Sequence, residues 1–331
     1  MPPSANLRNL SEPRHIGLLL VDGFALMSYA SVIEPYRAAN ALAGRTLYRW
    51  THISTGGEAS HASNGATIMA DQPVGLAVDC DTLFVFAGGD PTRFEDARTL
   101  AWLRSMAAKG TVIAGISAGP YLLARAGLLD SYHATVHWEH RTAFNEAFPL
   151  VILETGLYVI DRRRLTCAGG MAGMDLALEL IEREQGHMLA AQVSDWFIRS
   201  EPRAADRPQR LSLRDRYEIT NDRVLKVLAY MESTVGEPSS REILASVAGV
   251  SVRQLERLFA GHLGTSVNDF YLRTRLAQAE QLLRSTGLPI TDVAIACGFK
   301  SSSHFSRAYK QHFLRSPSDE RQPSEPRVRS R

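Results

Sequence analysis

The stretch TVIAGISAGPYLLARAGLLD, residues 111–130, decides how the N-terminal half of this chain folds. A β-branched apolar run enters the turn Gly-Ile-Ser-Ala-Gly, and a Leu- and Ala-rich segment with helical spacing leaves it. This order is typical of a nucleophile elbow, a strand-to-helix turn that exposes one side chain, here Ser117, beside backbone N–H groups. The stretch therefore predicts a sheet with a functional edge and raises the question of whether the protein is a hydrolase.

Strand-like and helical segments alternate on both sides of this turn. Short apolar runs at 15–21, 82–87 and 110–116 are typical of buried strands, and helical patterns lie between them. Pro35 predicts a kink or break near Glu34 in the first helix. The alternation predicts an α/β fold, a flavodoxin-like sandwich with a parallel sheet, whose ligands bind at the carboxyl ends of the strands.

An imperfect repeat characterises the C-terminal part. REILASVAGVSVRQLERLFAGHLGTS and ITDVAIACGFKSSSHFSRAYKQHFLRSP each predict two helices joined by a Gly-containing turn, with Ser251 and Ser301 capping the second helix. The apolar residues of that second helix are expected to face a shared core: Leu255, Phe259, Phe305 and Tyr309. The sequence thus predicts an all-α domain with two helix-turn-helix units.

The outward face of each second helix carries side chains suited to base edges and phosphates. A single exposed Arg is usually only a solvated charge, but two matched copies in one basic region favour DNA binding. The predicted DNA-binding residues are Arg253, Gln254 and Arg257 in the first copy and Ser302, Ser303, His304, Arg307 and Lys310 in the second.

Composition agrees with a DNA partner and with a cytoplasmic protein. Residues 201–331 hold 21 Lys and Arg against 15 Asp and Glu, whereas the rest of the chain is mildly acidic. Three widely spaced cysteines suit neither a disulfide framework nor a metal site. No apolar run approaches the roughly 18 residues of a membrane span. We therefore expect no membrane contact and no metal. We also expect no cofactor, because no phosphate-binding or dinucleotide motif is present.

The last hundred residues resemble the DNA-binding domain of the AraC/XylS family of bacterial transcription regulators. In that family a long helix joins two helix-turn-helix units, and SVRQLERLFAGHLGTSVNDFYLRTRLAQAEQLL together with ITDVAIACGFKSSSHFSRAYKQHF is similar across nearly the whole module. The chain departs from the family near its end. Leu314 stands where the family usually has Gly, and Glu320-Arg321 stand where an aromatic residue followed by Arg is usual.

VIAGISAGPYLLARAGLLD resembles the elbow of the PfpI-like branch of the class I glutamine amidotransferase-like superfamily. The superfamily normally has Cys at the position of Ser117, and ATVHWEH resembles the segment with its catalytic His, so His137 is expected near Ser117. A serine needs a base and a third group that orients the base. Ser28 and Tyr29 precede the first acid, Glu34, so the acid partner is not matched and a non-catalytic pocket is predicted.

The order of these two domains is similar to the GlxA family of transcription regulators, including regulators of carnitine, glycine betaine and arginine catabolism. The resemblance implies a small cationic or zwitterionic effector, which aromatic faces and carboxylates can hold. The effector's own carboxylate is expected to accept from the N–H groups around Ala118 and from the Ser117 hydroxyl. The expected ligand-binding residues are Glu34, Ser117, Ala118, His137, Trp138 and Glu139.

The sequence therefore predicts a homodimeric, sequence-specific transcription regulator, by resemblance an activator that would contact RNA polymerase. Two alternatives remain: an amidase or other hydrolase that uses Ser117 and His137 and is tethered to DNA, and an architectural DNA-binding protein. The predicted organisation is a disordered N-terminus (1–14), an amidotransferase-like ligand-sensing domain (15–199), a linker (200–222), an AraC-type DNA-binding domain (223–320) and a basic tail (321–331).

Overall fold

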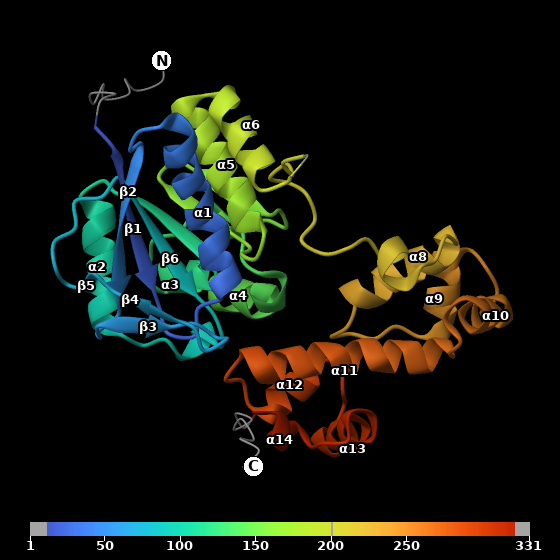
Figure 1. Cartoon of the computed structure of the whole chain (residues 1–331). Helices are drawn as coiled ribbons and strands as arrows, with labels where there is room; N and C mark the ends of the chain where they lie inside the picture. Colours follow the sequence, from blue (N-terminus) through green and yellow to red (C-terminus); the bar gives the residue numbers. More distant parts are fainter. Residues whose placement is uncertain (1–11, 200, 322–331) are drawn as a thin grey trace, which may run out of the picture. The chain divides into compact units, whose positions relative to one another are not determined.

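The computed structural model describes residues 12–199 and 201–321. They form two compact units, the first ending at Gln209 and the second beginning at Arg210. The first is an α/β unit and the second is helical, which confirms the predicted fold classes (Figure 1). Most of the N-terminus predicted to be disordered, and the basic tail beyond Arg321, lie outside the described residues, whereas Arg14 already belongs to the first strand.

A seven-stranded sheet in the order β10-β11-β7-β6-β1-β2-β5 forms the centre of the first unit. Its neighbouring strands run parallel except β10 and β11, which pair antiparallel. The sheet strands are β1 (Arg14–Leu20), β2 (Tyr48–Ser54), β5 (Gln72–Pro73), β6 (Thr82–Ala87), β7 (Val112–Ser117), β10 (Tyr158–Asp161) and β11 (Arg164–Cys167). Two further pairs are β3 (Ala59–His61) with β4 (Thr67–Met69) and β8 (His133–Ala134) with β9 (Ile152–Leu153).

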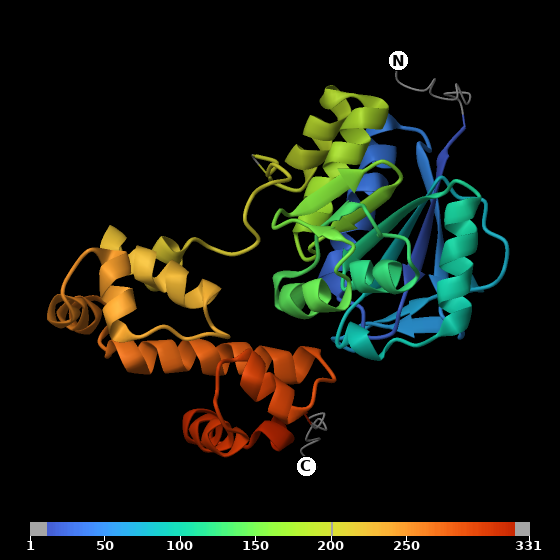
Figure 2. The same ribbon diagram turned by 180° about the vertical axis from the view of Figure 1, so that it is seen from behind.

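Helices cover both faces of this sheet (Figures 1 and 2). Along β7, Ala114 and Ile116 pack in one apolar layer and Ile113 packs in the other, because successive strand side chains point to opposite faces. The first layer includes α1 (Leu26–Ala43), α5 (Ala172–Gln185) and α6 (His187–Trp196). The second includes α2 (Ala97–Ala108), α3 (Gly119–Arg125) and α4 (Arg141–Ala147). Two 3-10 turns are η1 (Pro91–Arg93) and η2 (Trp138–His140).

The helix α1 continues through Pro35. The break predicted near Glu34 does not occur, since the helix extends for two more turns to Ala43. Pro35 is buried, and its neighbour Tyr36 packs in the first apolar layer. Burial of this face outweighs the one backbone hydrogen bond that a proline removes from a helix.

Eight helices make up the described part of the second unit. They are α7 (Leu213–Tyr217), α8 (Asp222–Ser233), α9 (Arg241–Ala248), α10 (Val252–Leu263), α11 (Val267–Ser285), α12 (Ile290–Ala296), α13 (Ser302–Phe313) and α14 (Pro317–Arg321). The pairs α9–α10 and α12–α13 are the two helix-turn-helix units, and the long helix α11 lies between them in the chain (Figure 1). Gly249 and Gly298 have left-handed backbones in the two turns, with φ of 64° and 72°.

The four apolar residues expected to face a shared core are fully buried, but they belong to two cores. Leu255 and Phe259 pack with α8, α9 and the start of α11. Phe305 and Tyr309 pack with α12 and the rest of α11. The expectation of one core is therefore wrong, because α11 is long enough to serve a separate apolar cluster near each end.

The interval 200–222, predicted to be a linker, contains ordered contacts of both units. Residues up to Gln209 pack on the α/β unit, where the Gln209 amide donates to Thr135, Val136 and Gly156. From Arg210 onward the chain belongs to the helical unit, and Ile219 is buried in its first core. Part of the predicted linker therefore packs on each unit.

The turn after α13 keeps the backbone of its counterpart after α10 although Gly is replaced. Gly264 has φ 64° and ψ 22°, and Leu314 has φ 60° and ψ 16°. Each N–H donates to the carbonyl four residues earlier, on Ala260 and Lys310 respectively. The Leu314 side chain lies in solvent with 88% of its surface exposed, so no packing offsets the left-handed backbone.

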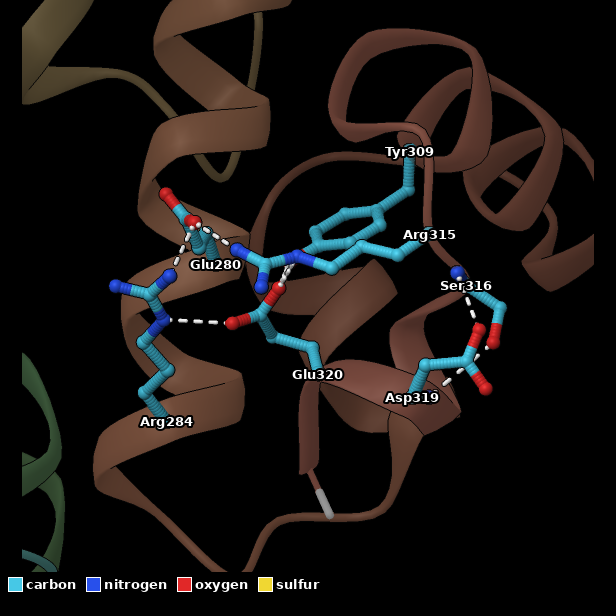
Figure 3. Close-up of polar contacts among 7 residues, drawn as sticks. All are labelled: Glu280, Arg284, Tyr309, Arg315, Ser316, Asp319 and Glu320. Carbon is cyan, nitrogen blue, oxygen red and sulfur yellow. Dashed lines mark hydrogen bonds and ion pairs between the residues drawn. The ribbon is translucent and has the colours of Figure 1, made fainter. Parts of the chain in front are cut away.

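A buried carboxylate stands where an aromatic residue was expected near the end of the second unit (Figure 3). The Glu320 side chain is only 3% exposed and forms ion pairs with Arg284, at 2.6 Å, and with Arg315. Tyr309 donates its hydroxyl hydrogen to Glu320 at 3.1 Å. Glu280 pairs with both arginines, so opposite charges alternate around the cluster. In the second helix-turn-helix repeat, hydrogen-bonded charges therefore hold α14 against α11 and α13.

We predict that Leu314→Gly stabilises the helical unit by about 1 kcal/mol, because Gly takes the left-handed conformation without the steric cost of a Cβ. Urea unfolding of the full chain measures the change. Leu314→Ala is the matched control, since it removes the same exposed side chain and retains the Cβ. A glycine variant no more stable than the alanine variant would contradict the prediction.

Candidate functional site

The turn between β7 and α3 has the geometry of an elbow. Ser117 has φ 62°, a left-handed backbone that is rare for a residue other than Gly. Close backbone approach explains the flanking glycines. A Cβ on Gly119 would lie 2.2 Å from the Val85 carbonyl oxygen, and a Cβ on Gly115 would lie 2.7 Å from the Pro120 nitrogen. The turn therefore requires these glycines and presents the Ser117 side chain half-buried at the sheet edge.

The loop after β11 and the start of α1 surround Ser117. A Cβ on Gly169 would lie 2.6 Å from the Ser117 Cβ and 2.9 Å from the Ser28 Oγ. Ser28 accepts a hydrogen bond from the Gly170 N–H at 2.8 Å. These neighbours were not among the predicted site residues. The pair Gly169-Gly170 after a predicted strand was the sequence signal for this contact, because glycine is required where backbones approach closely.

Ala118 does not offer its N–H to a ligand. The N–H donates to the Ala87 carbonyl at 3.2 Å, and the residue is fully buried. The expectation that a carboxylate accepts from this group therefore needs correction. The hydrogen bond joins the elbow to the end of β6 and helps to fix the turn.

The structure brings His137 to the elbow. Its backbone N–H donates to the Ser117 carbonyl at 3.5 Å, and its Nδ1 lies 3.5 Å from a carboxylate oxygen of Glu139. The ring centroids of His137 and Trp138 are 5.5 Å apart. Burial lowers the pKa of His137, and the Glu139 carboxylate partly opposes this shift. The segment thus places a neutral imidazole, an indole and a half-exposed carboxylate beside the turn.

Glu34 lies farther along α1 than the residues around the elbow. Ser28 contacts the elbow loops, whereas Glu34 is six residues later and pairs with Arg37 at 2.7 Å. Burial, and to a lesser extent the Glu34 charge, raises the pKa of Tyr29 to about 12. The structure thus pairs Glu34 with Arg37 and does not bring its carboxylate to Ser117.

The side chains around the elbow are not arranged as a catalytic triad. Within residues 12–199 and 201–321, no side chain hydrogen-bonds to the Ser117 hydroxyl. Cys167 is close to Gly169, but burial raises the pKa of its thiol to about 12, so it is a neutral thiol rather than a nucleophile. No group of three or more potential metal ligands occurs in this described part of the chain.

The two recognition helices have the same exposure at every matched position. Residues 251–270 and 301–320 show one sequence of exposed, half-buried and buried side chains, with an offset of 50 residues. Each helix begins after a serine whose Oγ accepts from a backbone N–H, that of Gln254 or of His304. The repeat thus presents equivalent outward faces built from different residues.

Seven of the eight predicted DNA-binding side chains are exposed. Ser302 is half-buried, and Gln254 is partly used for capping because its Oε1 accepts from the Ser251 N–H at 3.0 Å. The spacing of Ser251 and Gln254 is that of a capping box, in which Gln or Glu stands three residues after the capping serine. The other six are exposed on the outer faces: Arg253, Arg257, Ser303, His304, Arg307 and Lys310. Of these, Arg307 donates from Nε to the Ser303 carbonyl at 3.3 Å, and the His304 ring packs edge-on against Phe299.

Both units match known families. Residues 15–183 match the DJ-1/PfpI family, and residues 244–323 match a helix-turn-helix domain. The transcriptional regulator GbdR of Pseudomonas aeruginosa is 42% identical over 94% of this chain and 85% of its own length. GlxA of Rhizobium meliloti, also an HTH-type transcriptional regulator, is 41% identical over 96% of this chain and 97% of its own. The chain belongs to the HTH-type transcriptional regulators that join a DJ-1/PfpI domain to an AraC-type domain.

A solved structure adds to this assignment. An AraC family transcriptional regulator from Pseudomonas putida superposes with a TM-score of 0.50 and 26% identity, over 56% of this chain and all of that one. This regulator of transcription therefore binds DNA through the helical unit, and its function is not enzymatic. No helix within residues 12–199 and 201–321 is long and apolar enough to span a membrane.

We predict that Arg253→Ala and Arg307→Ala each weaken specific DNA binding by about 1–3 kcal/mol, because each removes a charged donor from a recognition helix. Fluorescence anisotropy on a DNA site that the wild-type protein selects from a random pool measures the loss. Arg223→Ala, at an exposed position of α8, is the control. Undiminished specific affinity in the double variant would show that these faces do not read bases.

We also predict that His140 makes the α/β unit sensitive to acid. Burial, and then the neighbouring His137, lowers the pKa of His140 from its ordinary 6.5 to about 4. Between these values the unfolded chain takes up a proton that the folded chain refuses, so stability falls as the pH drops from 6.5 to 4. From pH 7 to pH 5 the expected loss is about 2 kcal/mol.

Urea unfolding of His140→Gln measures this effect, since the variant should lose about 2 kcal/mol less than wild type over that pH interval. His187→Gln is the control, because the His187 side chain is 80% exposed in the same unit. Identical pH dependence of His140→Gln and wild type would contradict the assignment.

Proposed function

We propose that this regulator activates an amine or amino-acid catabolism operon when a small cationic or zwitterionic compound binds at the elbow of its α/β unit. Carnitine, glycine betaine and arginine represent the effector class. The observation that carries the proposal is the Ser117 turn itself. On a strained left-handed backbone it presents a hydroxyl with no side-chain partner among the described residues, in a unit attached to a DNA-binding module.

The neighbouring groups suit both ends of such a compound. The Trp138 ring and the Glu139 carboxylate, whose side chain is 48% exposed, can hold a quaternary ammonium or guanidinium group. The Ser117 hydroxyl can donate to the effector's carboxylate, and His137 lines the site as a neutral imidazole. The negative charge of Glu34 on α1 favours a cationic ligand, and its carboxylate already pairs with Arg37. Ala118 contributes the backbone that holds the turn rather than a free N–H.

The proposed response acts on DNA binding and then on RNA polymerase. The two recognition helices enter successive major grooves, and a homodimer reads repeated half-sites in the cytoplasm. The effector must bind one arrangement of the protein more tightly than another, because a ligand shifts an equilibrium only through this difference. Resemblance to the GlxA family supports activation over repression.

A thermal-shift screen tests the proposal. A saturating amine at about 100 times its Kd should stabilise the α/β unit by about 2.7 kcal/mol and raise its melting temperature by several degrees. Glu139→Gln should reduce this shift, because it removes the negative partner of the cation. Glu146→Gln is the matched control at an exposed position of the adjoining helix α4.

Two results would contradict the proposal. One is an unchanged melting temperature with carnitine, glycine betaine and arginine. The other is release of product from amide or ester substrates that Ser117→Ala abolishes, because it would show that the elbow is a catalytic nucleophile. A shift that Glu139→Gln leaves intact would place the bound cation elsewhere in the unit.

A further inference from the structure

Residues 201–209, here called the strap, are the last part of the α/β unit before the helical unit begins at Arg210. We propose that the strap carries the effector signal, and that Asp175 and Gln209 are the positioning residues that couple it to the elbow. The inference rests on the proposed function because it names the route by which occupancy of that site reaches the DNA-binding unit. Four sets of contacts support it.

The first anchor of the strap is a buried carboxylate. The Asp175 side chain is completely buried in the first turns of α5. Its Oδ2 accepts from the Arg203 guanidinium at 2.8 Å and 3.1 Å, and its Oδ1 accepts from the Arg203 backbone N–H at 2.9 Å. Arg199 forms a second ion pair with the same carboxylate. A buried charge must be paired, so the strap stays docked as long as α5 holds Asp175 in place.

The second anchor is at the other end of the strap. The Gln209 side-chain amide donates to the Thr135 hydroxyl, the Val136 carbonyl and the Gly156 carbonyl at 2.9–3.1 Å. Between the anchors, the Leu157 N–H donates to the Ala205 carbonyl at 2.7 Å. A Cβ on Gly156 would lie 2.4 Å from that same carbonyl oxygen. The strap is thus held to the unit at Arg203, Ala205 and Gln209.

Both anchors adjoin the loops that surround Ser117. Asp175 is five residues after Gly170, whose neighbour Gly169 contacts Ser117 and Ser28. Val136 immediately precedes His137, whose N–H donates to the Ser117 carbonyl. A compound that displaces either loop therefore moves an anchor of the strap. Packed and hydrogen-bonded elements of this kind can pass coupling energy between sites.

A strained residue precedes the strap. Ile198 has φ 56°, which is unfavourable for a β-branched side chain, and its side chain is 97% exposed. Its N–H donates to the Asp195 backbone carbonyl, and the Ser194 hydroxyl donates to the Arg199 carbonyl, each at 2.9 Å. With its side chain in solvent, this conformation depends on such backbone contacts and on the Arg199–Asp175 pair. Loss of the anchor thus favours a different path of the chain.

Residue-resolved hydrogen exchange of the full chain, without effector or DNA, tests the coupling in two directions. In the first, Arg203→Gln weakens the Asp175 anchor and leaves Arg199 to pair with the buried carboxylate. We expect five- to tenfold faster exchange of the Gly170 and His137 amides, which belong to the elbow loops. Arg207→Gln is the matched control, since it removes the same charge from an exposed position of the strap.

In the second direction the elbow is changed and the strap is observed. Gly169→Ala places a Cβ against Ser117, and we expect five- to tenfold faster exchange of the Arg203 and Leu157 amides. Gly186→Ala is the matched control, because Gly186 has nearly the same φ, 89° against 87°, and no atom lies near its missing Cβ. If Gly169→Ala fails to fold, the Arg203→Gln comparison still decides.

Coupling in either direction beyond the matched control supports the strap as the route. The proposal is overturned if exchange is faster only in the segment that carries the substitution. In that case the elbow amides in Arg203→Gln, and the Arg203 and Leu157 amides in Gly169→Ala, exchange no faster than in the matched control. Failure of the proposed function has a different signature: the coupling is present, but carnitine, glycine betaine and arginine leave the melting temperature unchanged. An amine-dependent shift without coupling overturns the strap and retains the effector site.

Discussion

At the end of β7 the backbone of Gly119 passes so close to β6 that no side chain fits, since a Cβ there would lie 2.2 Å from the Val85 carbonyl oxygen. This approach allows α3 to start directly after the strand and leaves Ser117 with a left-handed backbone. The same crowding requires Gly169 opposite Ser117. This packing of backbone on backbone fixes the turn that carries Ser117, around which the other groups of the candidate effector site are arranged.

An enzyme-like turn can serve regulation because its geometry and its reactivity depend on different groups. The geometry depends on glycines and on the hydrogen bond between Ala118 and Ala87, all of which are present. Reactivity would need a base directed at Ser117, whereas His137 faces Glu139 and the nearby Cys167 thiol is kept neutral by burial. A hydroxyl in this setting can still bind a carboxylate.

The helical unit shows that one backbone can be maintained by different chemistry. Gly264 and Leu314 have nearly the same left-handed conformation, although only the first is a glycine. Phe270 packs edge-on against Phe259 in the first copy, whereas Glu320 at the matched position pairs with Arg284 and Arg315 in the second. The two recognition helices keep the same pattern of exposure despite both substitutions. The segment after the first helix is held by apolar packing, and the segment after the second is held by paired charges.

Local patterns in the sequence determined the α/β and helical units, the elbow at Ser117 and the two capped recognition helices, because strand and helix periods, glycines and caps act over a few residues. They did not show that Ser28 and Gly169 meet at Ser117, that α11 serves two cores, or that residues 201–209 dock on Asp175 and Gly156. Those contacts join residues far apart in the chain. Only tertiary packing decides them, since a buried charge or hydroxyl finds its partner when the elements around it have come together.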